Sequence, residues 1–157
     1  MNEQAQELAQ RFEQANAEAI GVVEGCPEEQ WRAHHAGEGR SVNVLAHHIA
    51  VGHHAIAEWV QGIATGQPLP ALTMESFTEP NAQHARQFVN VTKPEVITEL
   101  QQQGAAAARL VRGLSDEQLD RTGELLGQQR RARDVIEGIL IGHVRSHLRS
   151  IHEALAT

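Results

Sequence analysis

Gly142-His143-Val144-Arg145-Ser146-His147-Leu148 places two histidines four residues apart in a segment with helical periodicity. Residues four apart lie on one face of an α-helix, about 6 Å apart along its axis, so two such imidazoles can bind one metal ion. With a rotation of roughly 100° per residue, both histidines fall in the apolar arc of this helix, and His152 points to the opposite side. The other members of that arc are Ile136, Ile139, Leu140, Ile151 and Ala154. The stretch therefore predicts either two core histidines with polar neighbours or two ligands of a metal site.

The composition around this stretch favours helices. The chain has 157 residues, is rich in Ala, Gln, Glu, Leu and Arg, and contains three Phe, two Trp and no Tyr. Strands favour β-branched and aromatic residues, whereas these common residues favour helices. A chain of this length buries roughly two thirds of its unfolded surface in one core. We therefore expect a single all-α domain over residues 1–157.

Charge and hydropathy argue against several classes of partner. The formal net charge is −7, whereas DNA-binding proteins rely on Lys and Arg to neutralise phosphates. The start MNEQAQELAQ has no apolar segment, and no apolar run approaches the ~20 residues of a membrane span. Cys26 is the only cysteine, which excludes an internal disulfide and suits a reducing compartment. We expect a cytoplasmic protein that binds neither nucleic acid nor membrane.

Periodicity and capping residues predict the helices. Ser41 and Thr92 are plausible N-caps of long helices. His84 is expected to be exposed on a short helix, and the polar segment with Arg130, Arg131 and Arg133 is predicted to be a loop. The predicted long helices span residues 3–24, 42–65, 94–113 and 133–156, and the short helix spans 81–90.

The connection over residues 66–80 decides the topology. Antiparallel helices in bundles need only about 2 to 8 connecting residues, so this longer irregular stretch suits a crossover along the bundle. We therefore predict a four-helix bundle, up-down-down-up, with a long crossover between helices 2 and 3. The pocket is expected where helix 2 begins. There the loop with Trp31, His34 and His35 and the segment 81–92 would cover it.

The second long helix contains four more histidines, which helical phase separates. His48 lies on the edge of the apolar stripe. His47 and His54 point away from it and are expected in solvent. His53 lies about 80° from the centre of the stripe on the other flank and is a reserve candidate.

Three histidines are then expected at one depth. His48 follows the start of helix 2 by about two turns, and His143 and His147 lie roughly two to four turns before the end of an antiparallel helix 4. Three neutral imidazoles with an open position are typical of a catalytic zinc or nickel site. Zincin proteases have Glu directly after the first His, but Val144 stands there, so no general base is identified.

Two segments resemble a known family. Gly39-Arg40-Ser41-Val42-Asn43-Val44-Leu45-Ala46-His47-His48-Ile49-Ala50 and His143-Val144-Arg145-Ser146-His147-Leu148-Arg149-Ser150-Ile151 are similar to motifs of the DinB-like or YfiT-like metal-binding four-helix bundles. Without a gap the family histidine falls on His48, whereas alignment on Val44-Leu45-Ala46 selects His47. Arg40 stands where the family usually has Trp, a departure that concerns the pocket wall more than the metal.

The resemblance implies a divalent metal held by three histidines and water, in a homodimer. Characterised members include thiol-dependent S-transferases and a mycothiol-dependent maleylpyruvate isomerase. We therefore expect a divalent-metal-dependent enzyme that uses a low-molecular-weight thiol on a small electrophilic molecule, as a thiol S-transferase or isomerase. The alternatives are a non-catalytic metal-binding stress-response protein and a helical interaction module without metal.

Overall fold

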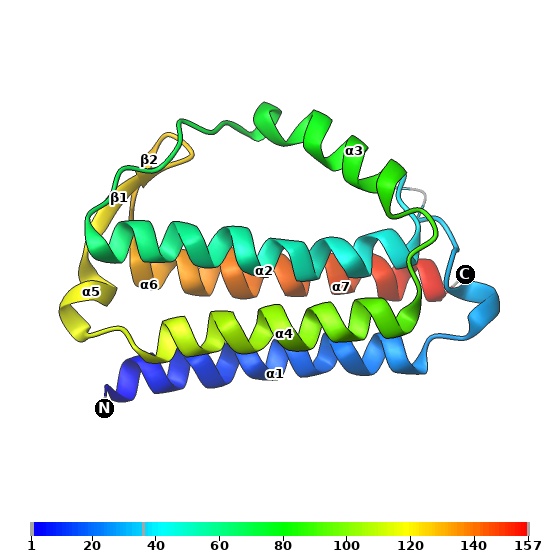
Figure 1. Cartoon of the computed structure of the whole chain (residues 1–157), viewed down its shortest axis with the longest axis horizontal. Coiled ribbons are helices and arrows are strands. Elements are labelled where there is room, and N and C mark those ends of the chain that lie inside the picture. Colours follow the sequence, from blue (N-terminus) through cyan, green and yellow to red (C-terminus); the bar gives the residue numbers. More distant parts are fainter. Residues whose placement is uncertain (1, 36, 157) are drawn as a thin grey trace.

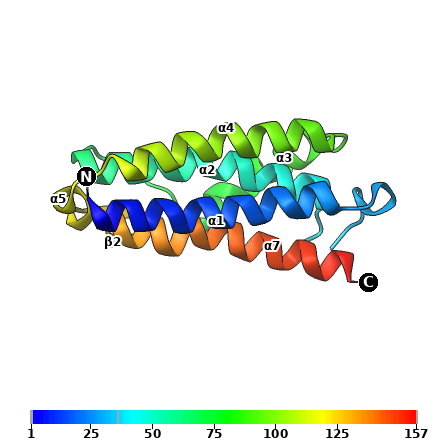
Figure 2. The same cartoon turned by 90° about the horizontal axis from the view of Figure 1, so that it is seen from below.

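Long helices dominate the structure, a computed structural model that describes residues 2–35 and 37–156. They are α1 (Glu3–Gly25), α2 (Val42–Thr65), α4 (Lys93–Arg112) and a last helical segment made of α6 (Ala132–Val135), the π-helix η3 (Ile136–Ile141) and α7 (Gly142–Leu155). These segments lie side by side in both views (Figures 1 and 2). The predicted all-α class is confirmed, and the long helices lie close to their predicted bounds.

The chain crosses the length of the molecule between α2 and α4. Figure 1 shows α1 running towards the end where α2 begins, and α2 running back. The crossover, with the 3-10 helix η2 (Met74–Phe77) and α3 (Thr78–Gln87), then returns the chain along the outside to the start of α4. The last helical segment runs opposite to α2 and α4 and ends near the start of α2. The crossover is therefore less irregular than predicted, since helical structure begins at Met74.

The core lies between α1, α2, α4 and the last helical segment. Contacts join α1 to α4, α4 to α2, and α2 to α7. Full burial of a large apolar side chain contributes roughly 1.5–3 kcal/mol. Large side chains with less than 2% exposure include Phe12, Leu45, Ile49, Ile63, Leu100, Ile136, Leu140 and Ile151.

A hairpin replaces the polar loop predicted before the last helix. Strands β1 (Thr122–Leu125) and β2 (Gln128–Arg131) pair antiparallel, so that prediction is wrong. Leu126 and Gly127 form the turn with φ of 54° and 78°, positive values that suit the twist of a two-residue hairpin. Leu125 is buried, with 1% exposure. Period-2 alternation is weak in such short polar strands, and Leu-Gly is not among the usual turn pairs.

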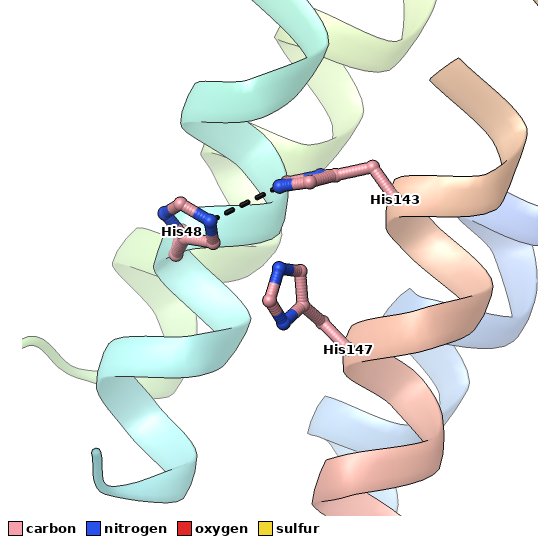
Figure 3. A group of neighbouring side chains, drawn as sticks. All are labelled: His48, His143 and His147. Carbon is pink, nitrogen blue, oxygen red and sulfur yellow. Dashed lines mark hydrogen bonds between the residues drawn. The ribbon is translucent and has the colours of Figure 1, made fainter. Parts of the chain in front are cut away.

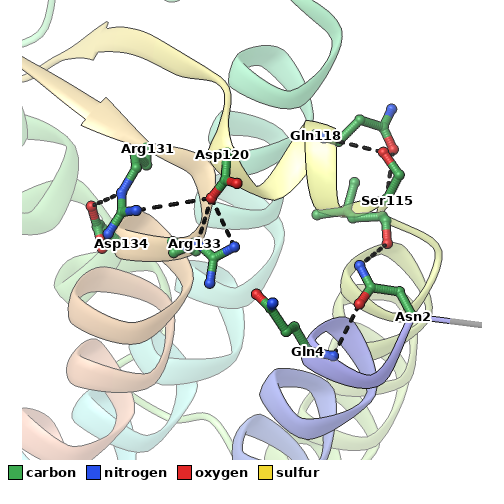
Figure 4. A network of polar contacts seen from close by, with 9 residues as sticks. Asn2, Gln4, Ser115, Gln118, Asp120, Arg131, Arg133 and Asp134 are labelled. Atoms are coloured by element: carbon green, nitrogen blue, oxygen red, sulfur yellow. Dashed lines mark hydrogen bonds and ion pairs between the residues drawn. The ribbon is translucent and has the colours of Figure 1, made fainter.

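Acidic residues pair with Arg131 of the hairpin and with Arg133 just after it (Figure 4). Arg131 donates to Asp134 over 3.0 Å, and an Arg133 nitrogen lies 2.8 Å from the Asp120 carboxylate. Arg130 donates to the backbone oxygen of Leu125. The arginines thus hold the hairpin on its surroundings, at the end of the molecule where α2 finishes.

The helices of the described chain are not membrane spans. Among residues 2–35 and 37–156, no helix is both long and apolar enough to cross a bilayer.

Candidate functional site

Three histidines from two antiparallel helices meet near the start of α2. His48 comes from α2, and His143 and His147 come from α7 (Figure 3). One ligand nitrogen from each lies within 4.8 Å of the others, and His143 Nε2 is 3.0 Å from His48 Nε2. The structure thus brings together the three residues predicted from helical phase, and they could bind a metal ion.

The π-helix before His143 changes the phase of the last helix. A π-turn contains more residues than an α-turn, so a constant step of about 100° does not relate the residues on its two sides. Val144 and Leu148 are buried, with 0% and 5% exposure, whereas His143 and His147 are half-buried beside them. The predicted arc through both histidines is therefore displaced. They lie at the edge of the core, facing α2.

Burial keeps the three imidazoles neutral. Burial, together with the nearby His143 and His147, lowers the pKa of His48 to about 2. Burial also lowers the pKa of His143 to about 3 and lowers that of His147. Neutral imidazole is the form that binds metal, so no proton has to leave these groups near neutral pH.

The donor set fits a divalent ion. In a tetrahedral zinc site with Zn–N bonds of about 2.0–2.1 Å, two ligand nitrogens lie roughly 3.3 Å apart. The 3.0 Å separation of His48 and His143 is close to this value. Three histidines leave one tetrahedral position open, as in catalytic zinc sites.

Glu38 is a further member of the site that sequence reasoning missed. Its Oε1 lies 3.5 Å from His147 Nδ1 and accepts a 2.9 Å hydrogen bond from Ser150, while Oε2 accepts one from Arg40. Burial alone would raise the pKa of this carboxyl, but the hydrogen bonds from Arg40 and Ser150 outweigh it and lower the pKa. A carboxylate that accepts a hydrogen bond from a ligand histidine orients its ring in metal sites, and Glu38 lies close to that position without such a bond in this structure.

The local backbone explains why Glu38 reaches the site. A backbone bridge joins His34 to Ser41, and His35 N–H donates to the Arg40 carbonyl, so the loop folds back on itself. The sequence predicts a loop here but does not assign Glu38 to the site, because no spacing rule connects residue 38 to a helix more than a hundred residues later.

Gly52 makes room for His143. A Cβ atom at Gly52 would lie 2.3 Å from His143 Cε1 and 2.7 Å from its Nδ1. Gly52 follows His48 by about one helical turn, so α2 supplies both a candidate ligand and the space for another. A side chain at this position would require the His143 ring to move.

His47 does not point to solvent, so that prediction is wrong. It has 6% exposure, its Nδ1 lies 2.8 Å from His84 Nε2, and its ring stacks on Phe88. His84, also expected to be exposed, is half-buried, with its ring 5.8 Å from that of His48. Both errors have one cause: α3 and the turn after it lie over this face of α2, and the phase of a single helix cannot reveal such a cover.

The reserve candidate His53 is a core histidine. It has 0% exposure, and its Nε2 lies 2.8 Å from Asn16 Oδ1. The Asn16 amide donates to the Leu100 carbonyl, and burial lowers the pKa of His53 to about 4. His53 is not part of the three-histidine group. His54 and His152 are exposed, as predicted.

The expected cover of the pocket is present in part. The segment 81–92 supplies His84 and Phe88, close to His48 and His47. Trp31, expected as a pocket wall, is buried with 4% exposure, and its indole N–H donates to the Val91 carbonyl over 3.0 Å. Trp31 therefore ties its loop to the chain before α4.

A comparison with protein-family models completes this description. The model described as DinB superfamily matches residues 11–151, a span that contains all three histidines. A search of curated proteins gives no match. Since the family match covers most of its length, the chain belongs to the DinB superfamily.

Proposed function

We propose that this protein is a divalent-metal-dependent enzyme in which His48, His143 and His147 hold zinc or nickel with one position open to a ligand. The observation that carries the proposal is the convergence of three imidazoles whose pKa values burial lowers. The up-down-down-up four-helix bundle is part of the proposal, because antiparallel α2 and α7 bring the histidines to one level.

The proposed reaction is thiol transfer or isomerisation on a small electrophilic molecule, with a low-molecular-weight thiol as cosubstrate. A divalent ion at this site would lower the pKa of a bound thiol and favour the nucleophilic thiolate. His48 and His143 supply neutral donor nitrogens. Glu38 lies beside His147 and would orient its ring, while His84 on α3 lies beside His48.

One observation favours a non-catalytic metal-binding stress-response protein instead. Among the described residues, Glu38 is the carboxylate beside His147, and Arg40 and Ser150 already donate hydrogen bonds to it. A carboxylate held in this way is a poor proton acceptor. This alternative predicts a bound metal without turnover.

Thiol consumption separates the two functions. Tag-free protein loaded with zinc or nickel would be mixed with low-molecular-weight thiols and small electrophiles, and the loss of free thiol would be followed. The enzyme proposal predicts turnover that His143→Ala abolishes and His152→Ala, an exposed control on α7, retains. Metal binding without turnover over a broad panel would favour the non-catalytic alternative.

The proposal includes the homodimer that the family resemblance implies and a small-molecule substrate as the main partner. Light scattering on purified protein would measure the mass in solution. A mass of one chain at micromolar concentration would contradict the dimer and leave the metal site unaffected.

A further inference from the structure

Arg40 has a donor that no residue of the described chain satisfies. Its Nη2 donates to Glu38 over 2.9 Å, but its Nη1 is buried and has no hydrogen-bond partner among residues 2–35 and 37–156. A guanidinium carries five N–H donors in a rigid fork. A buried charged donor without a partner is costly, so we look for a ligand that would complete it.

The position of Arg40 is next to the candidate metal site. Glu38 connects it to His147, because one carboxylate oxygen accepts from Arg40 while the other lies 3.5 Å from His147 Nδ1. Arg40 is therefore joined through Glu38 to a candidate metal ligand on α7.

His84 offers a second unpartnered atom on the α3 side. Its Nδ1 is buried without a partner in the part of the chain that the structure describes, while its Nε2 pairs with His47 Nδ1. If His47 donates in this pair, His84 Nδ1 carries the proton and is a donor. Two unpartnered donors then lie near the three histidines, one from the loop before α2 and one from α3.

The charges at the site favour an anionic ligand. A divalent ion on three neutral imidazoles, together with Arg40, contributes three positive charges, of which Glu38 offsets one. A positive group beside a metal opposes metal binding unless an anion compensates it. A carboxylate is the planar acceptor that suits a guanidinium fork.

We propose that Arg40 Nη1 binds the carboxylate of a small ligand whose other end occupies the open metal position, with His84 as a second donor. The proposal rests on the proposed function and defines its substrate class: a small thiol or electrophile that carries a carboxylate. An uncharged analogue of the same length would bind more weakly.

A cobalt-substituted protein tests this assignment without any turnover. Wild-type Co(II) protein would be titrated with 3-mercaptopropionate and with its uncharged methyl ester, and the thiolate-to-cobalt absorption band would give both affinities. We expect 3-mercaptopropionate to bind roughly ten- to hundredfold more tightly, as for a hydrogen bond between charged groups. The acid and its methyl ester also differ in the acidity of their thiols. This difference is the same for every variant, so it drops out when the ratio of the two affinities is compared between proteins.

Variants of Arg40 test whether its side chain causes the preference for the acid over the ester. Arg40→Met should reduce the affinity ratio by about tenfold or more relative to the wild-type protein, and Arg40→Lys should restore part of the ratio. Arg149→Met removes the same charge from an exposed position on α7 and should keep the wild-type ratio. Circular dichroism on each variant would establish that it is folded.

Different outcomes overturn different claims. Equal affinity of wild-type protein for the acid and the ester would overturn the carboxylate assignment and leave the metal site intact. An Arg40→Met variant that loses cobalt affinity but keeps the ratio would show that Arg40 only holds Glu38 in place. Absence of cobalt binding by wild-type protein would overturn the proposed metal site, and this inference with it.

Discussion

His48, His143 and His147 are half-buried at the edge of an apolar core, and this position sets their charge. Burial is the largest cause of the lowered pKa of each. The apolar residues around them marked their faces in the sequence pattern well enough to predict that these three side chains lie together. The same pattern wrongly placed His47 in solvent. Phe88 and His84 cover its side chain, and they belong to a segment that the periodicity of α2 alone does not include.

His47→Ala is expected to separate stability from metal binding. It removes the stacking on Phe88 and the contact with His84, so the free energy of unfolding should fall by about 1–3 kcal/mol. Zinc affinity should stay nearly unchanged, since His47 is outside the three-histidine group. Urea denaturation and calorimetric titration would measure the two effects. A large loss of zinc affinity would favour His47 over His48 as a ligand.

His53 is expected to make the metal-free protein less stable in acid. Its pKa is about 4 in the folded protein, against 6.5 ordinarily, so the unfolded chain binds a proton first as the pH falls. This contribution to stability is complete above pH 6.5 and is lost as the pH falls towards 4. Between pH 7.5 and 4.5 it amounts to roughly 2–3 kcal/mol.

The variant His53→Gln isolates that contribution. It removes the titrating group but keeps an amide that can pair with Asn16. Urea denaturation at both pH values should show a smaller loss of stability on acidification than in the wild-type protein, by roughly 2–3 kcal/mol. His54→Gln, on the exposed face of the same helix, serves as the control. Equal acid sensitivity of His53→Gln and wild-type protein would contradict the assignment.

At the scale of single elements, helical periodicity did not predict two features of the structure, the π-helix and the hairpin. The π-helix Ile136–Ile141 contains apolar residues and one glycine, like many regular helices, so its altered hydrogen bonding leaves no mark in the pattern. The hairpin Thr122–Arg131 is equally hidden, because its short strands are polar and only Leu125 is fully buried in them. Both features depend on contacts with distant segments.

Gly52→Ala tests the fit between α2 and the last helical segment. An alanine usually stabilises a helix by up to about 1 kcal/mol over glycine. Here its Cβ would lie 2.3 Å from His143 Cε1, so the ring must move from its position beside His48. We expect zinc affinity to fall roughly 10- to 100-fold, as when groups that orient metal ligands are lost.

Gly21→Ala is the matched control for that change. Gly21 lies in α1, and a Cβ atom added there would meet nothing within 4 Å, so the variant should be at least as stable as wild type and bind zinc equally well. Unchanged zinc affinity in Gly52→Ala would show that His143 can be a ligand in another rotamer, or that it is not a ligand.

At the scale of the whole molecule, the length of the connection between α2 and α4 carries the most information. A stretch too long for a tight turn predicted the crossover, and the structure has η2 and α3 on it. The crossover sets the directions of the later helices, and so brings His48 and His143, 95 positions apart, within 3.0 Å. The loop before α2 could not be predicted in the same way, since Glu38 and Arg40 meet the site only after α7 has packed against α2.

The most direct test of the central claim is calorimetric titration of metal-free, tag-free protein with zinc and nickel. The wild-type protein is expected to bind about one ion per chain with a Kd below ~10 µM, equivalent to about 7 kcal/mol. His48→Ala, His143→Ala and His147→Ala should each lose most of this affinity, whereas His54→Ala and His152→Ala should retain it. Failure of the wild-type protein to bind either ion more tightly than ~10 µM, or full affinity in a folded His48→Ala protein, would contradict the three-histidine metal site.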